Sequence, residues 1–362
     1  MERTMNRKLV LEDGSEYYGY AFGSKKDRVC EIVFNTSMAG YQEIMSDPAY
    51  TNQMIVMTYP LIGNYGMADE DFESRTPTCG GLIVREYNDN PSNFRSVKTL
   101  GETMEEYEIP GIAGMDTRKL TRVLRDNGSC KAMITDADTP TKVALKTIKE
   151  TVLPFNLVEK VACKKRWYAR TANAKYNVVA IDCGIKLSLI KALKNLGCNL
   201  TIVPYTTPAS EVEGMKPDGI ILSDGPGSPE SVPEVSELIS KLKGKYPIFG
   251  VGLGHQLVAL SYGARIVKLK HGHHGANHPI KNLDSGKIET YPQNHDYTVD
   301  PESVNGTKLT VSQIDIIDNS IMGLECKEDK IFTAQYDPKI ISGPDGTICL
   351  FDKFVKLMKE AK

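Results

Sequence analysis

The chain has 362 residues, enough for two domains that each bury a hydrophobic core. Its 44 Lys and Arg nearly balance its 46 Asp and Glu, so charge does not indicate a nucleic acid or a membrane surface as partner. The eight cysteines are scattered singly, which favours reduced thiols in a cytoplasmic protein over a disulfide framework. We expect no signal peptide in MERTMNRKLV, and no stretch reaches the ~20 apolar residues of a membrane span.

The first half, residues 1–150, is predicted to be a mixed β and α domain. KLVLEDGSEYYGYAFG alternates in hydrophobicity around Asp13-Gly14, which indicates a β-hairpin. CEIVFNTSMAGYQEIM is typical of a strand that leads through a polar turn into a short helix. DTRKLTRVLRDNGS predicts a helix with Asp116 as N-cap and Gly128 just past its end.

Residues 151–176 are basic and follow neither the helical nor the strand period, so we interpret them as a linker. Residues 177–362 then alternate apolar strands (YNVVAIDCG from 176, NLTIVPY, GIILSDGPGSP, PIFGVG) with amphipathic helices. This order predicts an α/β domain with a doubly wound, mostly parallel sheet. Such sheets bind ligands at the carboxyl ends of their strands, where SDGPGSP and GVGLGHQ both occur.

The stretch PIFGVGLGHQLVAL has the shape of a nucleophile elbow, in which a Ser or Cys lies between a strand and a helix. Gly252 stands at the apex and brings no side chain. The glycine spacing is not that of a dinucleotide fingerprint, and Lys268 and Lys270 stand where its acidic residue would be. A plain tight turn between strand and helix is the alternative from the residues alone.

The segment HGHHGANHP holds His271, His273, His274 and His278, but their spacing matches no common zinc pattern. We expect an irregular loop whose histidines bond to the backbone, and no metal. In SDGPGSP, the amides at Gly225 and Gly227 are suited to bind an anion or oxyanion. A simple connection between a strand and a helix is equally consistent with that segment.

Together these stretches resemble the small subunit of carbamoyl phosphate synthetase, a class I glutamine amidotransferase. FNTSMAGYQEIMSDPAYTNQMIVMTYPLIGNYG is similar to the signature of that subunit's N-terminal domain, and SDGPGSP, GVGLGHQLVAL, HGHHGANHP and PQNHDYTVD follow in the family's order. The resemblance implies the class I glutamine amidotransferase fold and a large subunit as partner. In the family, the small subunit hydrolyses glutamine, and the ammonia passes through a tunnel to the large subunit. The resemblance implies no cofactor in this chain, since ATP and magnesium would belong to the large subunit.

The family's chemistry uses a Cys nucleophile, a His that activates it and a Glu that orients the His. By resemblance, Gly252 stands at the Cys position. Aligning QYDPKIISGP on Pro338 and on the later Gly-Pro places Asp337 at the His position and Lys339 at the Glu position. By this alignment all three triad members are replaced. Asp337 could act as a weak base towards water, but we expect it to form an ion pair with Lys339 instead. Cys183 follows a different strand and is discounted as a substitute nucleophile.

The glutamine pocket is only partly altered. By resemblance, its positions are Ser37, Gly225, Gly227, Leu253, Gln256, Asn294 and Tyr297, all with residues that the family accepts. Asp296 stands where the family has a glycine and adds bulk and charge. Binding of glutamine is therefore left open.

Three hypotheses follow. The first is a small subunit without glutaminase activity that serves as structural or regulatory partner of a large subunit using free ammonia. The second is an active glutaminase that uses an unrecognised nucleophile. The third is a free-standing protein that binds glutamine or another amino acid.

Overall fold

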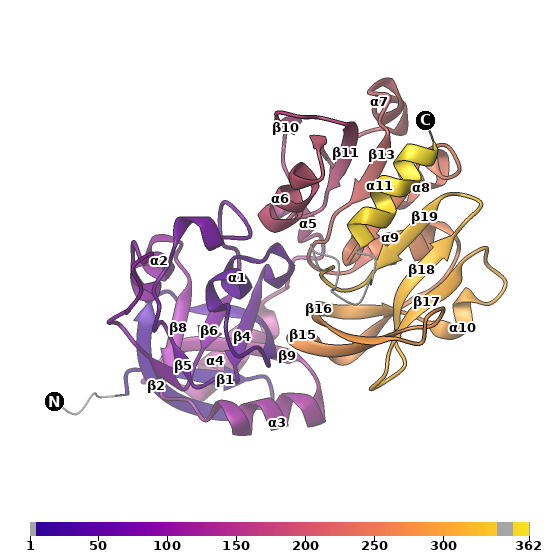
Figure 1. The fold of residues 1–362 in the computed structure, drawn as a ribbon. Helices are drawn as coiled ribbons and strands as arrows, with labels where there is room; N and C mark the ends of the chain where they lie inside the picture. The colour runs from indigo at the N-terminus through magenta and orange to yellow at the C-terminus, as the bar shows by residue number, and fades with distance from the viewer. Residues whose placement is uncertain (1–4, 339–349, 362) are drawn as a thin grey trace. The chain divides into compact units, whose positions relative to one another are not determined.

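The computed structural model describes residues 5–338 and 350–361, and the chain divides into two compact units (Figure 1). Unit 1 is Met1–Pro154 with Lys270–Gly275, and unit 2 is Phe155–Leu269 with Ala276–Lys362. Lys339 and the Gly-Pro pair used in the alignment lie outside the described residues. None of the helices in the described residues combines the length and the hydropathy of a membrane-spanning segment.

Unit 1 contains a closed barrel with the strand order β1-β2-β8-β6-β4-β3-β9. Its strands are β1 (Arg7–Leu11), β2 (Glu16–Gly23), β3 (Arg28–Asn35), β4 (Gln53–Met57), β6 (Gly81–Ile83), β8 (Pro110–Ala113) and β9 (Cys130–Asp136), with the short pair β5 (Leu61–Ile62) and β7 (Glu86–Tyr87) outside the barrel. Its helices are α1 (Tyr41–Ser46), η1 (Pro48–Tyr50), η2 (Asp69–Asp71), α2 (Leu100–Glu106), α3 (Thr117–Asn127) and α4 (Thr141–Glu150).

The local predictions for unit 1 are confirmed. β1 and β2 pair antiparallel around the predicted turn, where Gly14 has a φ of 89°. α3 begins after Asp116, whose carboxylate accepts a hydrogen bond from the amide of Lys119, and it ends at Gly128. The side chains of β3 and β9 that face the barrel interior are buried and apolar, so the barrel is closed around a packed core.

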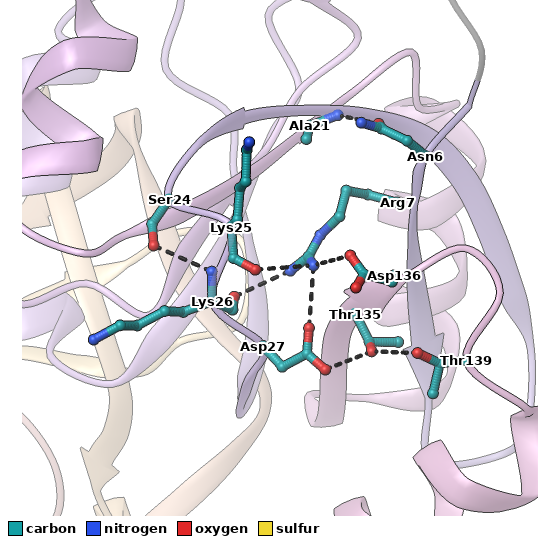
Figure 2. Close-up of polar contacts among 10 residues, drawn as sticks. All are labelled: Asn6, Arg7, Ala21, Ser24, Lys25, Lys26, Asp27, Thr135, Asp136 and Thr139. Atoms are coloured by element: carbon teal, nitrogen blue, oxygen red, sulfur yellow. Dashed lines mark hydrogen bonds and ion pairs between the residues drawn. The ribbon is translucent and has the colours of Figure 1, made fainter.

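A buried cation ties the barrel to a loop in unit 1 (Figure 2). The guanidinium of Arg7 donates to Asp27 at 3.1 Å and to Asp136 at 2.7 Å. It also donates to the carbonyls of Lys25 and Lys26 at 3.1 and 3.0 Å. A buried charge is tolerated only when it is paired and hydrogen-bonded, and Arg7 meets both conditions.

The described residues of unit 2 form a ten-stranded sheet with the order β10-β12-β11-β13-β14-β19-β18-β17-β15-β16. The strands are β10 (Trp167–Ala169), β11 (Tyr176–Asp182), β12 (Cys198–Pro204), β13 (Gly219–Leu222), β14 (Ile248–Val251), β15 (Ile266–Asn282, of which residues 270–275 group with unit 1), β16 (Ile288–Val299), β17 (Thr310–Asp315), β18 (Ile321–Cys326) and β19 (Ile331–Ala334). The helices are α5 (Val158–Val161), α6 (Leu187–Asn195), α7 (Ala209–Gly214), η3 (Pro229–Ser231), α8 (Pro233–Leu242), α9 (Leu253–Ser261), α10 (Pro301–Val304) and α11 (Leu350–Glu360).

The predicted doubly wound sheet is confirmed. β12, β11, β13, β14 and β19 are parallel neighbours, and β18 and β17 extend them antiparallel. Helices α8 and α9 contribute to one buried apolar cluster, while α6 and α11 contribute to the other. Apolar side chains thus cover both faces of the sheet, as parallel strands require.

Two segments differ from their predicted local structure. HGHHGANHP is part of strand β15 and not an irregular loop, so that expectation is wrong. Gly272 has a φ of 69° inside the strand, and a glycine at such a point allows a bulge or bend without ending the strand. The segment predicted as a linker, 151–176, contains α5 and also β10, which pairs antiparallel with β12.

Candidate active site

The predicted elbow is a strand-to-helix turn at the centre of the unit 2 sheet. β14 ends at Val251, α9 begins at Leu253, and Gly252 between them has φ 54° and ψ −112°. Glycine adopts a positive φ easily, whereas other residues adopt it with strain. The amide of Gly252 donates to the carbonyl of Ala334 at 2.8 Å, which fixes the turn against β19. Gly252 therefore lies at the carboxyl end of a parallel strand, where ligands bind in such sheets.

The carboxylate of Asp224, which follows β13, takes up the space beside Gly252. A Cβ built on Gly252 would overlap both Oδ1 and Cγ of Asp224. The same Oδ1 accepts hydrogen bonds from the amides of Leu253 at 2.9 Å and Gly225 at 2.8 Å. In hydrolases with an elbow, the amide after the nucleophile and an amide from another strand end form the oxyanion hole. In this chain, one internal oxygen is bonded to both corresponding amides.

A lysine lies between two carboxylates at the same edge of the sheet. The ammonium of Lys186, which directly precedes α6, contacts the two carboxylate oxygens of Asp337 at 2.9 and 2.8 Å. It also lies 3.8 Å from Oδ2 of Asp224. The side chains of Lys186 and Asp224 are 8% and 10% exposed, while that of Asp337 is 38% exposed. The buried lysine and aspartate thus compensate each other's charge, and the pairing predicted for Asp337 with Lys339 falls outside the described residues.

Gln256 points from α9 towards β16 and β19. Its side-chain amide donates to the carbonyl of Tyr297 at 2.9 Å and to Oε1 of Gln335 at 3.0 Å. Its neighbour His255 is fully buried and shares a 2.8 Å hydrogen bond with the hydroxyl of Thr333. Burial lowers the pKa of His255 to about 3, so this imidazole is neutral near pH 7 and a poor base.

The other predicted pocket positions are distributed over both units. Asn294, Asp296 and Tyr297 lie on β16, where strand alternation puts Asn294 and Asp296 on one face and Tyr297 on the other. Ser37 belongs to unit 1, where its amide donates to the side chain of Asn35 at 2.7 Å. The roles of these positions in glutamine binding stay predictions.

Local packing by itself requires the two glycines of SDGPGSP and the leucine of the elbow. A Cβ on Gly225 would overlap the carbonyl oxygen of Cys183, and Gly227 has a φ of 82°. The side chain of Leu253 is buried in the apolar cluster beneath α9. These residues therefore fit a close-packed turn whether or not a substrate binds there.

Cys183 directly follows β11, and β13 separates that strand from the elbow strand β14. The thiol is fully buried, and burial raises its pKa well above the usual value. The carboxylates of Asp182 and Asp224 raise it further. A thiol is nucleophilic as thiolate, so Cys183 is unsuited to replace the missing elbow cysteine.

The histidines of β15 are engaged in different ways. In unit 1, the rings of His271 and His274 contact those of Phe34 and Tyr50, each at 5.5 Å between centroids. His271 also bonds through Nδ1 to the carbonyl of Gly272 at 2.9 Å. The expectation of no metal in this chain stays a prediction.

Sequence reasoning missed two residues of the site, Asp224 and Lys186. A signal for both was present, because Asp224 lies two residues after β13 and Lys186 four residues after β11, so each brings a charge to the carboxyl edge of the parallel sheet. The motifs that contain these two residues predicted roles for Gly225 and Gly227 as an anion site, and only Cys183 was considered as a reactive group there. The structure places Asp224 beside Gly252, Lys186 beside Asp224, and Asp337 on Lys186.

Comparisons with known proteins match both halves of the chain. The family model for carbamoyl-phosphate synthase small chain, CPSase domain, matches residues 9–134, and that for glutamine amidotransferase class-I matches residues 179–357. The chain is 46% identical over 351 residues to the carbamoyl phosphate synthase small chain of Fusobacterium nucleatum, covering 97% of this chain and 98% of the relative. It is 47% identical over 356 residues to that of Staphylococcus haemolyticus, covering 98% and 97%. It is 46% identical over 355 residues to the carbamoyl phosphate synthase pyrimidine-specific small chain of Bacillus subtilis, covering 98% and 96%.

Proposed function

The chain belongs to the carbamoyl phosphate synthase small chain family, and we propose that it is a member that no longer hydrolyses glutamine. In this proposal it acts in the cytoplasm as structural or regulatory partner of a large subunit that takes free ammonia. ATP and magnesium would bind to the large subunit, and this chain would need no cofactor. The observation that carries the proposal is the elbow apex, where Gly252 has no side chain and the Asp224 carboxylate fills the adjacent space.

Covalent hydrolysis of a side-chain amide needs a nucleophile, a base for its proton and an oxyanion hole. At the elbow the nucleophile is replaced by a glycine. The residue at the predicted base position, Asp337, has both carboxylate oxygens bonded to Lys186. The two amides suited to an oxyanion hole already bond to Asp224. Loss of triad members lowers turnover by up to about a millionfold, so each of these changes argues against hydrolysis.

Among the described residues near the elbow, we find no good replacement for the lost groups. Cys183 is held as a thiol by burial and by two neighbouring carboxylates. His255 is neutral, fully buried and bonded to Thr333. The alternative of an active glutaminase with an unrecognised nucleophile would therefore need a group outside this set.

The N-terminal unit supports a role in a complex. Its family model matches residues 9–134, and the stretch that resembles the small-subunit signature runs from the end of β3 through α1 and β4 of the barrel unit. The divergent residues predicted for the triad all lie in the C-terminal half. A free-standing binding protein with no role in carbamoyl phosphate synthesis would not need this N-terminal unit, so its presence favours a role in the complex.

The test is to co-express the chain with the large subunit of its own organism and to measure carbamoyl phosphate synthesis from ammonium and from glutamine. We expect synthesis from ammonium, none above background from glutamine, and co-purification of the two chains. Large subunit alone serves as the control for synthesis that needs no partner. Glutamine-dependent synthesis at a rate comparable to that with ammonium would contradict the proposal, and failure to co-purify would favour a free-standing binding protein.

A further inference from the structure

We propose that Asp224 is a built-in ligand of the oxyanion hole, whose carboxylate occupies the anion site of this chain and excludes the side-chain carbonyl of glutamine. The inference deepens the proposed function and rests on it, because it supplies a physical reason for the absence of hydrolysis. It also predicts a property that the family chemistry does not imply. Without the Asp224 carboxylate, the hole becomes a site for a small monocarboxylate.

The hydrogen bonds support a ligand role for this carboxylate. One oxygen, Oδ1, accepts from two amides that belong to different strand ends, Gly225 after β13 and Leu253 after β14. Gly225 is the adjacent residue, so that bond alone would be a local turn contact. The bond to Leu253 spans 29 positions and joins the two halves of the hole. A carboxylate oxygen in this place makes the two contacts that a tetrahedral oxyanion would need.

The charges around the site favour an anion there. The Lys186 ammonium lies 3.8 Å from Oδ2 of Asp224, and the amide of Leu253 is at the positive end of the nine-residue helix α9. Asp337 is the opposing negative group, and it is bonded to Lys186 through both of its oxygens. Asp224 is buried, so the anion in the hole is largely shielded from water.

The geometry also excludes the substrate. The Asp224 carboxylate overlaps the position of any Cβ at residue 252, which is where the nucleophile of an active elbow would begin. A glutamine carbonyl directed at the amides of Gly225 and Leu253 would have to displace Oδ1 from both of them. It would also leave a buried carboxylate without these donors, which is unfavourable.

Asp224→Ala provides the test, because the atoms that it removes correspond to formate. We expect the variant to bind formate saturably and wild type not to bind it at this site. Acetate should bind more weakly and propionate not at all, since each added carbon must fit beside the remaining Cβ. With three non-hydrogen atoms, formate should bind with a Kd no tighter than about 0.5 mM.

The readout is the amide of Leu253. Gly-Leu pairs occur at 81–82, 252–253 and 323–324, so labelling Gly carbonyls with ¹³C and Leu amides with ¹⁵N selects Leu82, Leu253 and Leu324. We expect Asp224→Ala to shift the Leu253 resonance and formate to reverse the shift. The resonances of Leu82 and Leu324 should stay in place as internal controls. Adding Lys186→Met to Asp224→Ala should weaken formate binding at least tenfold.

Asp224→Asn is the matched control, because its side chain keeps the hole filled. It should bind no formate, and its Leu253 resonance should lie between those of wild type and Asp224→Ala. If Asp224→Ala does not fold, Asp224→Asn carries the test. A Leu253 resonance that is the same in wild type and in the foldable variant would overturn the inference.

The two proposals fail separately in this design. Glutamate release by wild-type protein would contradict the loss of hydrolysis, whatever the Leu253 resonance shows. If wild-type protein releases no glutamate and the Leu253 resonance is the same in wild type and in the Asp224 variant, only the role of Asp224 is contradicted.

Discussion

Each unit buries a basic side chain between two carboxylates, Arg7 in unit 1 and Lys186 in unit 2. In the Arg7 cluster, the carboxylates are the exposed partners: Asp27 and Asp136 have side chains that are 46% and 65% exposed. Backbone carbonyls supply the remaining acceptors. Arg7 therefore acts as a hydrogen-bonding clamp whose charge is compensated at the surface.

In the Lys186 cluster, one of the two carboxylates, Asp224, is itself buried. Asp224 is 10% exposed in its side chain, and its contacts include two backbone amides and a lysine. These are the donors that a reaction intermediate would use in an active elbow. The Lys186 cluster lies at the carboxyl edge of a parallel sheet, where ligands bind, and the Arg7 cluster does not. The position of the Lys186 cluster therefore relates it to the ligand site as well as to stability.

The largest effect is expected from rebuilding the catalytic site. Gly252→Cys alone should give no measurable glutamate release, because the thiol lacks an imidazole and would overlap Asp224. Combining it with Asp337→His, Lys339→Glu, Asp296→Gly and Asp224→Ala should release glutamate at least ~10²-fold faster than any single variant. Glutamate release is measured with the large subunit present.

The control for this set is the same combination without Asp224→Ala, which should be no faster than the single variants. Robust turnover by Gly252→Cys alone would show that an unidentified base is present. It would also show that the alignment of QYDPK to the triad is wrong.

Removing each buried cation should show whether it stabilises its unit mainly through hydrogen bonds, as we expect for Arg7, or mainly through charge compensation, as we expect for Lys186. Arg7→Met should lower the free energy of unfolding by about 2–4 kcal/mol, somewhat below the range for fully buried pairs because its carboxylates can hydrate. Lys186→Met should lower it by about 1–3 kcal/mol, below the range for a fully buried pair, because Asp224 keeps its bonds to the amides of Gly225 and Leu253 and Asp337 can hydrate. Urea denaturation of each variant at pH 7 measures both values.

Neutralising one carboxylate in each cluster distinguishes a loss of stability caused by an uncompensated charge from one caused by lost hydrogen bonds. Asp224→Asn should recover most of the loss in Lys186→Met, since no uncompensated charge is left in the hole. Asp27→Asn should recover little in Arg7→Met, because the bonds to the carbonyls of Lys25 and Lys26 are still lost. Equal recovery in the two units would contradict the distinction between them.

The sequence predicts well what depends on neighbouring residues. The turn at Gly14, the capped helix α3 and the strand-helix alternation of unit 2 follow from local propensity and period. Closure of the barrel depends on β1 pairing with β9, more than 100 residues later, and no local pattern encodes it. The strand β15 was missed because its glycines are typical of loops, while its pairing with β16 and β17 decides its structure.

The same limit applies to the site. The glycine at the elbow apex and the predicted triad position of Asp337 both come from motifs, because each occupies a fixed place in a short pattern. The contact of Asp224 with the Leu253 amide requires two strand ends to be neighbours and one side chain to turn between them. Lys186 comes from a third strand end. Sequence position indicated the correct edge of the sheet, and the tertiary structure selected the groups that meet there.

A smaller effect concerns pH, through His255. Its pKa is lowered to about 3 in the folded state, against about 6.5 when unfolded. The unfolded chain therefore binds more protons between these values, and stability falls as the pH falls from 6.5 towards 3. From pH 7 to pH 5 this group should lower the free energy of unfolding by about 2 kcal/mol. Urea denaturation at both pH values should show a smaller drop for His255→Gln, and an equal drop would contradict a neutral, buried imidazole.

The smallest effect is an energetic coupling between Gly252 and Asp224. Gly252→Ala should cost about 1–3 kcal/mol for the positive φ and a further ~1–2 kcal/mol because the new Cβ overlaps the Asp224 carboxylate. In an Asp224→Ala background only the first cost should persist, so the double-mutant cycle should give a coupling of about 1–2 kcal/mol. Gly225→Ala paired with Asp224→Ala is the control: its Cβ would overlap the carbonyl of Cys183 instead, so most of its cost should be independent of Asp224. Additive costs at Gly252 would mean that Asp224 moves aside freely. Coupled costs would mean that the carboxylate is held in the hole by Gly225, Leu253 and Lys186 strongly enough to oppose a side chain at the apex.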